Sequence, residues 1–271
     1  MKYLLQSVSL INVHQFCKPQ RGALQSSAKR SISLLLIFAG LLYSAKTMAQ
    51  EVVINDANAE KRTLSASFSA IKVSTGIELY LSQGDEESIA VSASDPKYME
   101  RFKTEVENGT LKIYYDNKGM VWNGNEKRRL KAYVSFKTLQ RLDGSSGAEV
   151  QVKGKLQMPT LSIDFSSGAE FTGEVNCDEL STEQSSGAQV TITGAAKKLT
   201  VEVSSGALFK GFELATDFCD ARAGSGGGIR IQVNIELNAK ASSGGGIKYT
   251  GSGVIKDLNV NSGGSVKRSA Q

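Results

Sequence analysis

One short phrase is repeated seven times in the second half of the chain, and it constrains the fold more than any other feature of the sequence. The phrase is Ser-Ser-Gly-Ala or a close relative of it. Its central glycines are separated by 21, 19, 19, 20, 18 and 19 residues, and they are Gly147, Gly168, Gly187, Gly206, Gly226, Gly244 and Gly263. A period of about twenty residues, with apolar residues alternating between the glycines, is typical of a stacked solenoid.

The residues around each glycine follow a fixed register. Serine precedes every central glycine, alanine or glycine follows it, and Val, Phe or Ile lies three residues after it. In the five middle repeats the residue seven before the glycine is Leu161, Leu180, Leu199, Cys219 or Leu237. These offsets are all odd, so the residues share one face of an extended chain, and we expect all of them to point inward. The serine column would then form hydrogen bonds inside the bend.

The repeat therefore predicts an all-β fold, a parallel β-helix with about seven short rungs of ~19 residues. Each rung buries a thin apolar stripe, and stacking at about 4.8 Å per rung joins the stripes into one core on the order of 34 Å long. Glycine allows the sharp bend at each corner. We expect a single domain over residues 65–271, with the regular repeats at 141–268.

Residues 65–140 are expected to form an irregular, β-rich N-terminal part of the same domain. Apolar and polar residues alternate here, which predicts strands, and residues 74–77 resemble a degenerate copy of the repeat phrase. The Asp-Pro pair at 95–96 predicts a helix N-terminus, followed by one or two helical turns over Lys97–Phe102. The Asn-Gly pair at 108–109, between apolar residues, predicts a hairpin.

The first 49 residues have the pattern of a secretory signal peptide. Lys29 and Arg30 precede an apolar run at 34–42, and small residues then occupy positions 47 and 49. We expect cleavage after Ala49, with residues 50–64 as a flexible, charged lead-in. The alternative is an uncleaved anchor helix, but the apolar run is shorter than the about 20 residues of a membrane span. The mature chain is thus expected to lack a membrane span and to be periplasmic, outer-membrane-associated or extracellular.

Removing residues 1–49 changes the charge balance and the available chemistry. The chain has 32 Lys and Arg against 27 Asp and Glu, but six of the basic residues and none of the acidic ones lie in the leader. The mature chain is therefore close to neutral, which argues against nucleic-acid binding. The single histidine, His14, also lies in the leader. Without histidine the mature chain cannot form a Ser-His or Cys-His nucleophile or a His-ligated metal site, and we expect no cofactor.

Two cysteines remain after the leader, Cys177 and Cys219. They fall two rungs apart and at different positions within the rung, so two rung steps alone separate their Cα atoms by about 10 Å. A disulfide needs a shorter Cα separation than this. We predict two buried free thiols.

Few residues are candidates for contact with a partner. Arg230 and Lys248 each lie four residues past their corner glycine and would stack as a basic ladder on the outer face. Trp122, with Arg128 and Arg129 close in sequence, forms a second candidate contact patch, although such a tryptophan often caps a core. The other charged residues of the repeats look scattered singly.

The repeats lack the signatures of catalysis or metal binding. Calcium-binding β-rolls place an aspartate in every turn, where this chain has Ser, Ala and Gly. A β-helix enzyme of the polysaccharide-lyase kind needs clustered carboxylates and a basic residue that takes a proton. We therefore predict no catalytic and no metal-binding residues. The serine columns could instead accept glycans or present hydroxyls to a ligand. A structural role agrees better with their odd offset from the glycines, which puts them on the same face as the core residues.

The repeat and two further segments resemble the head-GIN-domain family, described as putative auto-transporter adhesins and found in envelope proteins of Bacteroidetes. One segment runs from Phe68 to Asp85 with alternating Ile, Val and Leu, and the other runs from Val106 to Ile113. With the Ser-Gly-Ala bends they cover about residues 65–268. The resemblance implies a right-handed β-helix similar to pectin-lyase-type folds but without catalytic residues, and an adhesive or envelope role.

The sequence supports a non-enzymatic, secreted or cell-envelope β-helix that acts as an adhesin or as a binding or structural module. Its partner would be an envelope protein or a surface glycan, and the sequence leaves the oligomeric state open. The alternative function is that of a carbohydrate-active, polysaccharide-lyase-like enzyme. An elongated groove lined by at least three converging carboxylates would favour the enzyme.

Overall fold

The computed structural model describes residues 56–119 and 127–269. This part of the chain is almost entirely β-structure, with one short 3-10 helix at Pro96–Tyr98. Its strands are β1 (Glu60–Arg62), β2 (Ala70–Val73), β3 (Glu78–Gln83), β4 (Ser88–Ser92), β5 (Phe102–Glu107), β6 (Thr110–Tyr115), β7 (Lys131–Phe136), β8 (Arg141–Gly144), β9 (Glu149–Phe165), β10 (Glu170–Gln184), β11 (Gln189–Val203), β12 (Leu208–Ala223), β13 (Gly228–Ala241), β14 (Gly246–Thr250), β15 (Val254–Val260) and β16 (Ser265–Arg268).

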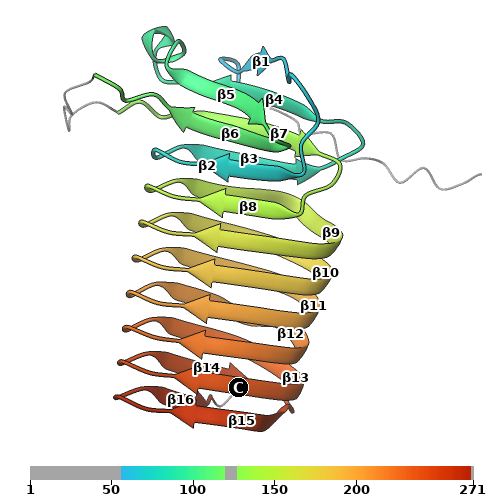
Figure 1. Cartoon of the computed structure of the whole chain (residues 1–271). Helices are drawn as coiled ribbons and strands as arrows, with labels where there is room; N and C mark the ends of the chain where they lie inside the picture. Colours follow the sequence, from blue (N-terminus) through green and yellow to red (C-terminus); the bar gives the residue numbers. More distant parts are fainter. Residues whose placement is uncertain (1–55, 120–126, 270–271) are drawn as a thin grey trace, which may run out of the picture. The chain divides into compact units, whose positions relative to one another are not determined.

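The repeats form the predicted right-handed parallel β-helix (Figure 1). Strands β9 to β13 each follow the coil around most of one turn, and each pairs in parallel with the strand of the next rung. The register is that of the sequence repeat, since Leu161 pairs with Leu180 and Leu180 with Leu199. The sequence period of about 19 residues is therefore one turn of the coil.

Each corner is a tight turn with two consecutive residues in the left-handed region. Ser146 has φ 54° and Gly147 has φ 71°, and the other six Ser-Gly pairs have closely similar values. The Ala148 N–H donates to the Ser145 carbonyl at 3.2 Å across the turn, as in a type I′ turn. The Gly147 N–H donates to the Ser167 carbonyl of the next rung at 3.0 Å, so the corners themselves form a hydrogen-bonded ladder.

The serine column does not point into the core as predicted. Ser146 is exposed, whereas Ala148 two residues later is fully buried, and all seven corners repeat this exposed serine. Among the described residues no hydrogen bond joins the seven hydroxyls to another group. The prediction was wrong because alternation of faces holds for extended backbone only. Two left-handed residues at the corner turn the serine outward.

The apolar columns lie inside the coil as the register predicts. The residue three past the glycine is buried in the first six repeats, and the column seven before the glycine is buried from Leu161 to Leu237. Phe165 and Phe171 pack edge to face, with ring centroids 5.8 Å apart. Cys177 and Cys219 are buried and free, which confirms the prediction of two unpaired thiols.

The N-terminal part adds two further rungs whose order in space differs from their order in sequence. β2 and β3 form a rung around the corner at Thr75 and Gly76, with φ 64° and 68°, so the degenerate copy of the phrase is an eighth corner. β6 and β7 stack on the other side of this rung. The chain then returns, and β8 and β9 pair with β2 and β3 on the side opposite β6 and β7.

Antiparallel strands cover the N-terminal end of the coil. β5 pairs with β6 through the predicted Asn-Gly hairpin, β4 pairs with β7, and β1 pairs with β4. β1 lies within the stretch 50–64, so residues 60–62 are an ordered strand and not part of a flexible lead-in. Asp95 caps the 3-10 helix as predicted, accepting from the Lys97 N–H at 3.0 Å, but the helix ends at Tyr98 and Phe102 already begins β5.

The C-terminal end of the coil carries no such cover within the described residues. Leu258 and Val260 continue the inward columns of β13, because they pair with Ala239 and Ala241, yet they are 54% and 45% exposed. The predicted signal peptide at 1–49 and Trp122 lie outside the residues that the structure describes. In the ranges 56–119 and 127–269 no helix has the length and apolar character needed to cross a membrane.

Candidate functional site

An extended array of polar side chains lies on the strands that leave the corners. The residues four past each corner glycine pair with one another from rung to rung, because the parallel register keeps one position in one column. We call this set the outward column. Tyr133 on β7 extends the outward column, because it pairs in register with Tyr80. The members in spatial order are Tyr133, Tyr80, Gln151, Thr172, Thr191, Lys210, Arg230, Lys248 and Lys267.

The C-terminal four members of the outward column are all cations, and we call them the basic ladder. Lys210 on β12 pairs with Arg230 on β13, Arg230 with Lys248 on β14, and Lys248 with Lys267 on β16. The predicted stacking of Arg230 and Lys248 is therefore present. Arg230, Lys248 and Lys267 are exposed, and Lys210 is half-buried and donates to Gln189 Oε1 at 3.0 Å.

No carboxylate neutralises the basic ladder within the described part of the chain, since the ion pairs there all involve other cations. The neighbouring positions two residues earlier are neutral and mostly small: Leu208, Gly228, Gly246 and Ser265. Like charges on adjacent strands repel one another. The basic ladder is thus a strip of positive charge without paired carboxylates, and mostly small side chains lie beside it.

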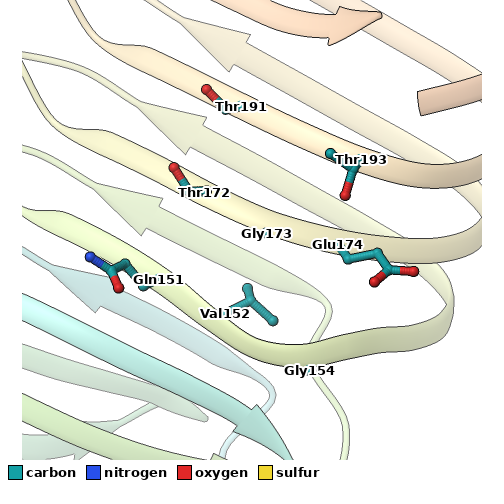
Figure 2. A pocket seen from close by; sticks show the side chains of 8 residues that line it. All are labelled: Gln151, Val152, Gly154, Thr172, Gly173, Glu174, Thr191 and Thr193. Carbon is teal, nitrogen blue, oxygen red and sulfur yellow. The ribbon is translucent and has the colours of Figure 1, made fainter. Parts of the chain in front are cut away.

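A hollow of about 500 Å³ continues the outward column toward the N-terminal end (Figure 2). Gln151, Thr172 and Thr191 of the column line it, together with Thr193 and Glu174. The hollow lies where the register of neighbouring strands shifts and where glycines replace larger side chains on β9 and β10. A side chain at Gly173 would meet Val152, so this glycine keeps the floor of the hollow open.

The hollow is rich in hydrogen-bonding groups. Within the described residues the hydroxyls of its three threonines have no hydrogen-bond partner. Glu174 is paired with Lys155 at 2.6 Å, and the Gln151 amide donates to Glu149 at 2.7 Å. The arrangement can bind hydroxyl-bearing ligands, because free hydroxyls both donate and accept hydrogen bonds.

Two stacked tyrosines end the outward column beside the N-terminal cover. The rings of Tyr80 and Tyr133 lie 5.2 Å apart at an angle of 14°, and the Lys153 ammonium lies 4.8 Å from the Tyr80 centroid. The Tyr133 hydroxyl donates to Asp56 at 3.0 Å. Burial, with the Asp56 carboxylate as a further cause, raises the pKa of Tyr133 to about 12. The side chains at this end of the outward column are thus held by contacts within the fold.

The strands that enter the corners carry a second ladder of opposite sign, which we call the acidic ladder. Asp143, Asp164, Glu183 and Glu202 lie four before their corner glycines and pair in register, and the column continues with Arg222 and Lys240. The interpretation of these charges as scattered singly was wrong. These charges lie far apart along the chain, but the coil aligns them across rungs.

The acidic ladder is partly neutralised from within. The Arg141 guanidinium lies 2.7 Å from Asp143 and 3.1 Å from Asp164. Burial raises the pKa of Asp143, and Arg141 opposes that rise. No group of three or more His, Cys, Asp or Glu side chains in the described ranges is arranged to hold a metal ion.

The structure places the predicted patch around Arg128 and Arg129 apart from the basic ladder. Both arginines line a hollow of about 300 Å³ near the corner at Thr75 and Gly76, and Ser146 of the next corner also lines it. The Arg128 guanidinium lies 4.3 Å from the Tyr115 ring centroid and donates to Asn117 at 2.8 Å. This corner lies five rungs from that of Arg230, or about 24 Å at the strand spacing. The two candidate sites are therefore not one surface.

The chain matches a known protein family over most of its length. The model of a family described as putative auto-transporter adhesin, head GIN domain, matches residues 67–253. The chain belongs to this family. The resemblance seen in the corner phrase and the segments before it is thereby confirmed.

Solved structures share the fold of this head GIN domain. A putative adhesin from Bacteroides fragilis NCTC 9343 has a TM-score of 0.70 at 18% identity, covering 78% of this chain and 96% of that chain. A putative adhesin from Parabacteroides merdae ATCC 43184 has a TM-score of 0.62 at 16% identity, covering 79% and 98%. A putative lipid binding protein from Parabacteroides distasonis ATCC 8503 has a TM-score of 0.59 at 19% identity, covering 79% and 98%. No curated protein matches the chain.

Three hollows lined by described residues of the head GIN domain hold few carboxylates. The hollow on the outward column contains one carboxylate, from Glu174, and the hollow beside Arg128 contains none. A third, of about 170 Å³, places Asp220 and Asp257 beside Arg222 and Lys240. None of the three has the three converging carboxylates that would favour the enzyme.

Sequence reasoning found half of the basic ladder and missed the rest. Lys210 and Lys267 lie four past Gly206 and Gly263, so the same offset that identified Arg230 and Lys248 would have identified them. The hollow has no comparable signal, because it depends on shifts in strand register that differ between rungs.

The two thiols of the domain are expected to resist alkylation while the protein is folded. Burial raises the pKa of Cys177 to about 11 and also raises that of Cys219, so neither forms appreciable thiolate near neutral pH. Intact mass after iodoacetamide treatment at pH 8 should show no adduct in native buffer and two adducts in denaturant. Rapid native labelling of Cys219 would contradict the packing described here.

Proposed function

We propose that this head GIN domain is an exported, non-enzymatic binding module of the cell envelope that acts as an adhesin. The observation that carries the proposal is the outward column, in which the coil presents exposed and half-buried polar and cationic side chains at a constant spacing. Family membership supports an adhesive role. A partner that is itself extended, such as a surface glycan or an elongated envelope protein, fits a surface of this form.

The proposal includes the processing and location of the chain. Residues 1–49 act as a signal peptide, cleavage follows Ala49, and the remainder folds as one domain that is periplasmic, outer-membrane-associated or extracellular. The free thiols do not oppose this location, because both are buried and protected from oxidation. N-terminal sequencing of the protein recovered from the producing cells should begin at Gln50, in a fraction other than the cytoplasm.

Binding to envelope material tests the proposed function directly. The purified mature chain should cosediment with isolated cell envelopes in a saturable way and should release no new reducing ends from a panel of acidic polysaccharides. Loss of cosedimentation, with steady depolymerisation of one of the polysaccharides, would contradict the proposal and favour the enzyme.

A further inference from the structure

We propose that the basic ladder binds a linear acidic polysaccharide, one chain of which lies along the axis of the coil from Lys267 toward Thr172. This inference rests on the proposed function and names the class of ligand. Its first support is the unpaired charge of Lys210, Arg230, Lys248 and Lys267.

Several other cations of the coil pair with acids from an adjacent rung. Lys155 pairs with Glu174 at 2.6 Å, Lys256 pairs with Glu236 at 3.0 Å, and Lys197 also pairs with Asp178. The basic ladder departs from this pattern at four successive rungs, where each cation has a like charge as its neighbour. Because adjacent like charges destabilise a sheet, a bound polyanion would relieve repulsion that the fold leaves uncompensated.

The spacing of the ladder favours a polymer over a small anion. Successive cations are one rung apart, about 4.8 Å, and the four of them span about 14 Å. A single phosphate or carboxylate can contact no more than two of them at once. A linear chain with one carboxylate per sugar presents its charges at intervals comparable to the rung spacing, so it can pair with every rung.

The surroundings of the ladder favour a sugar over a nucleic acid. Single-stranded nucleic acids are bound by rows of aromatic rings on which bases stack. Beside the ladder the coil instead has Gly228, Gly246 and Ser265, which leave room for a bulky ring close to the backbone. The faces of the two column tyrosines are occupied by each other and, for Tyr80, by Lys153.

The hollow extends the same track with uncharged groups. Thr191 pairs in register with Lys210, and Thr172 and Gln151 follow on the next two rungs (Figure 2). Hydroxyl and amide groups suit the hydroxyls of a sugar chain, and the carboxylates of that chain would be held by the cations. The column thus combines charge recognition at one end with hydroxyl recognition at the other.

A titration with polygalacturonate, a linear polymer with one carboxylate per sugar, tests the inference. The chain offers a matched control, because Arg222 and Lys240 also stack in register but on the strands that enter the corners. We expect the double variant Arg230→Gln/Lys248→Gln to raise the dissociation constant about tenfold or more, and Arg222→Gln/Lys240→Gln about twofold or less. The fully methyl-esterified polymer should not bind.

The outcomes separate the ligand from the general function. Equal losses in the two double variants, or unchanged binding in both, would overturn the inference at the basic ladder. Binding to cell envelopes without binding to polygalacturonate would overturn the ligand class and leave the proposed function standing, whereas binding to neither would overturn both. Self-association that Arg230→Gln/Lys248→Gln removes, with no polysaccharide binding, would instead assign the ladder to a contact with the acidic ladder of a second copy.

Discussion

Leu237→Ala is expected to lower the free energy of unfolding by about 2–5 kcal/mol, whereas Leu258→Ala should lower it by less than about 1 kcal/mol. Both leucines belong to inward columns, but Leu237 is fully buried between rungs and Leu258 on the last rung is 54% exposed. The difference arises because truncation inside the coil leaves a cavity, while truncation at the open end does not.

Urea denaturation followed by circular dichroism gives both values. The two variants carry the same chemical change in neighbouring parallel strands, so intrinsic propensity cancels in the comparison. Similar losses at the two positions would mean that the C-terminal rung is covered in solution. Cover of that kind would come from a contact outside the described residues.

The second large effect is expected at a glycine that is not part of the corner phrase. Gly194 has φ 107°, and a Cβ there would collide with the Val175 carbonyl oxygen of the preceding rung. Gly187, a corner glycine with φ 75°, has open space where a Cβ would be placed. Gly187→Ala therefore adds backbone strain alone, of about 1–2 kcal/mol, while Gly194→Ala adds strain and overpacking that together reach about 2–5 kcal/mol.

Thermal and chemical unfolding of the two variants should rank them in that order. The corner variant should also keep native thiol protection, because the turn lies outside the core. A larger loss in Gly187→Ala than in Gly194→Ala would show that the corner tolerates a side chain less well than its open surroundings indicate.

The fold was predictable because the repeat fixes strand register as well as strand length. Once Leu161, Leu180 and Leu199 share an offset from their glycines, parallel stacking follows, and so does the alignment of Arg230 with Lys248. The same arithmetic extends to Lys210 and Lys267 and to the acidic ladder. Each of these residues lies at a constant offset from its corner glycine, so the sequence carries the signal for both ladders.

Other features depend on geometry that the repeat does not encode. The alternation rule placed Ser146 inside, but the left-handed backbone at the corner reverses that assignment. The rung formed by β6 and β7 lies outside that of β2 and β3, an order that no local pattern specifies. The hollow arises from bulges between neighbouring rungs. The average repeat length of the sequence does not show where these bulges lie.

The central claim is that the outward column is the binding surface of this domain, and amide chemical shifts measure this most directly. In a titration of the isotopically labelled mature chain with polygalacturonate, the amides of Thr191, Lys210, Arg230, Lys248 and Lys267 should shift together and saturate together. The amides of the acidic ladder should stay in place. Shifts centred on the acidic ladder or on the hollow beside Arg128, with the outward column unperturbed, would contradict the claim.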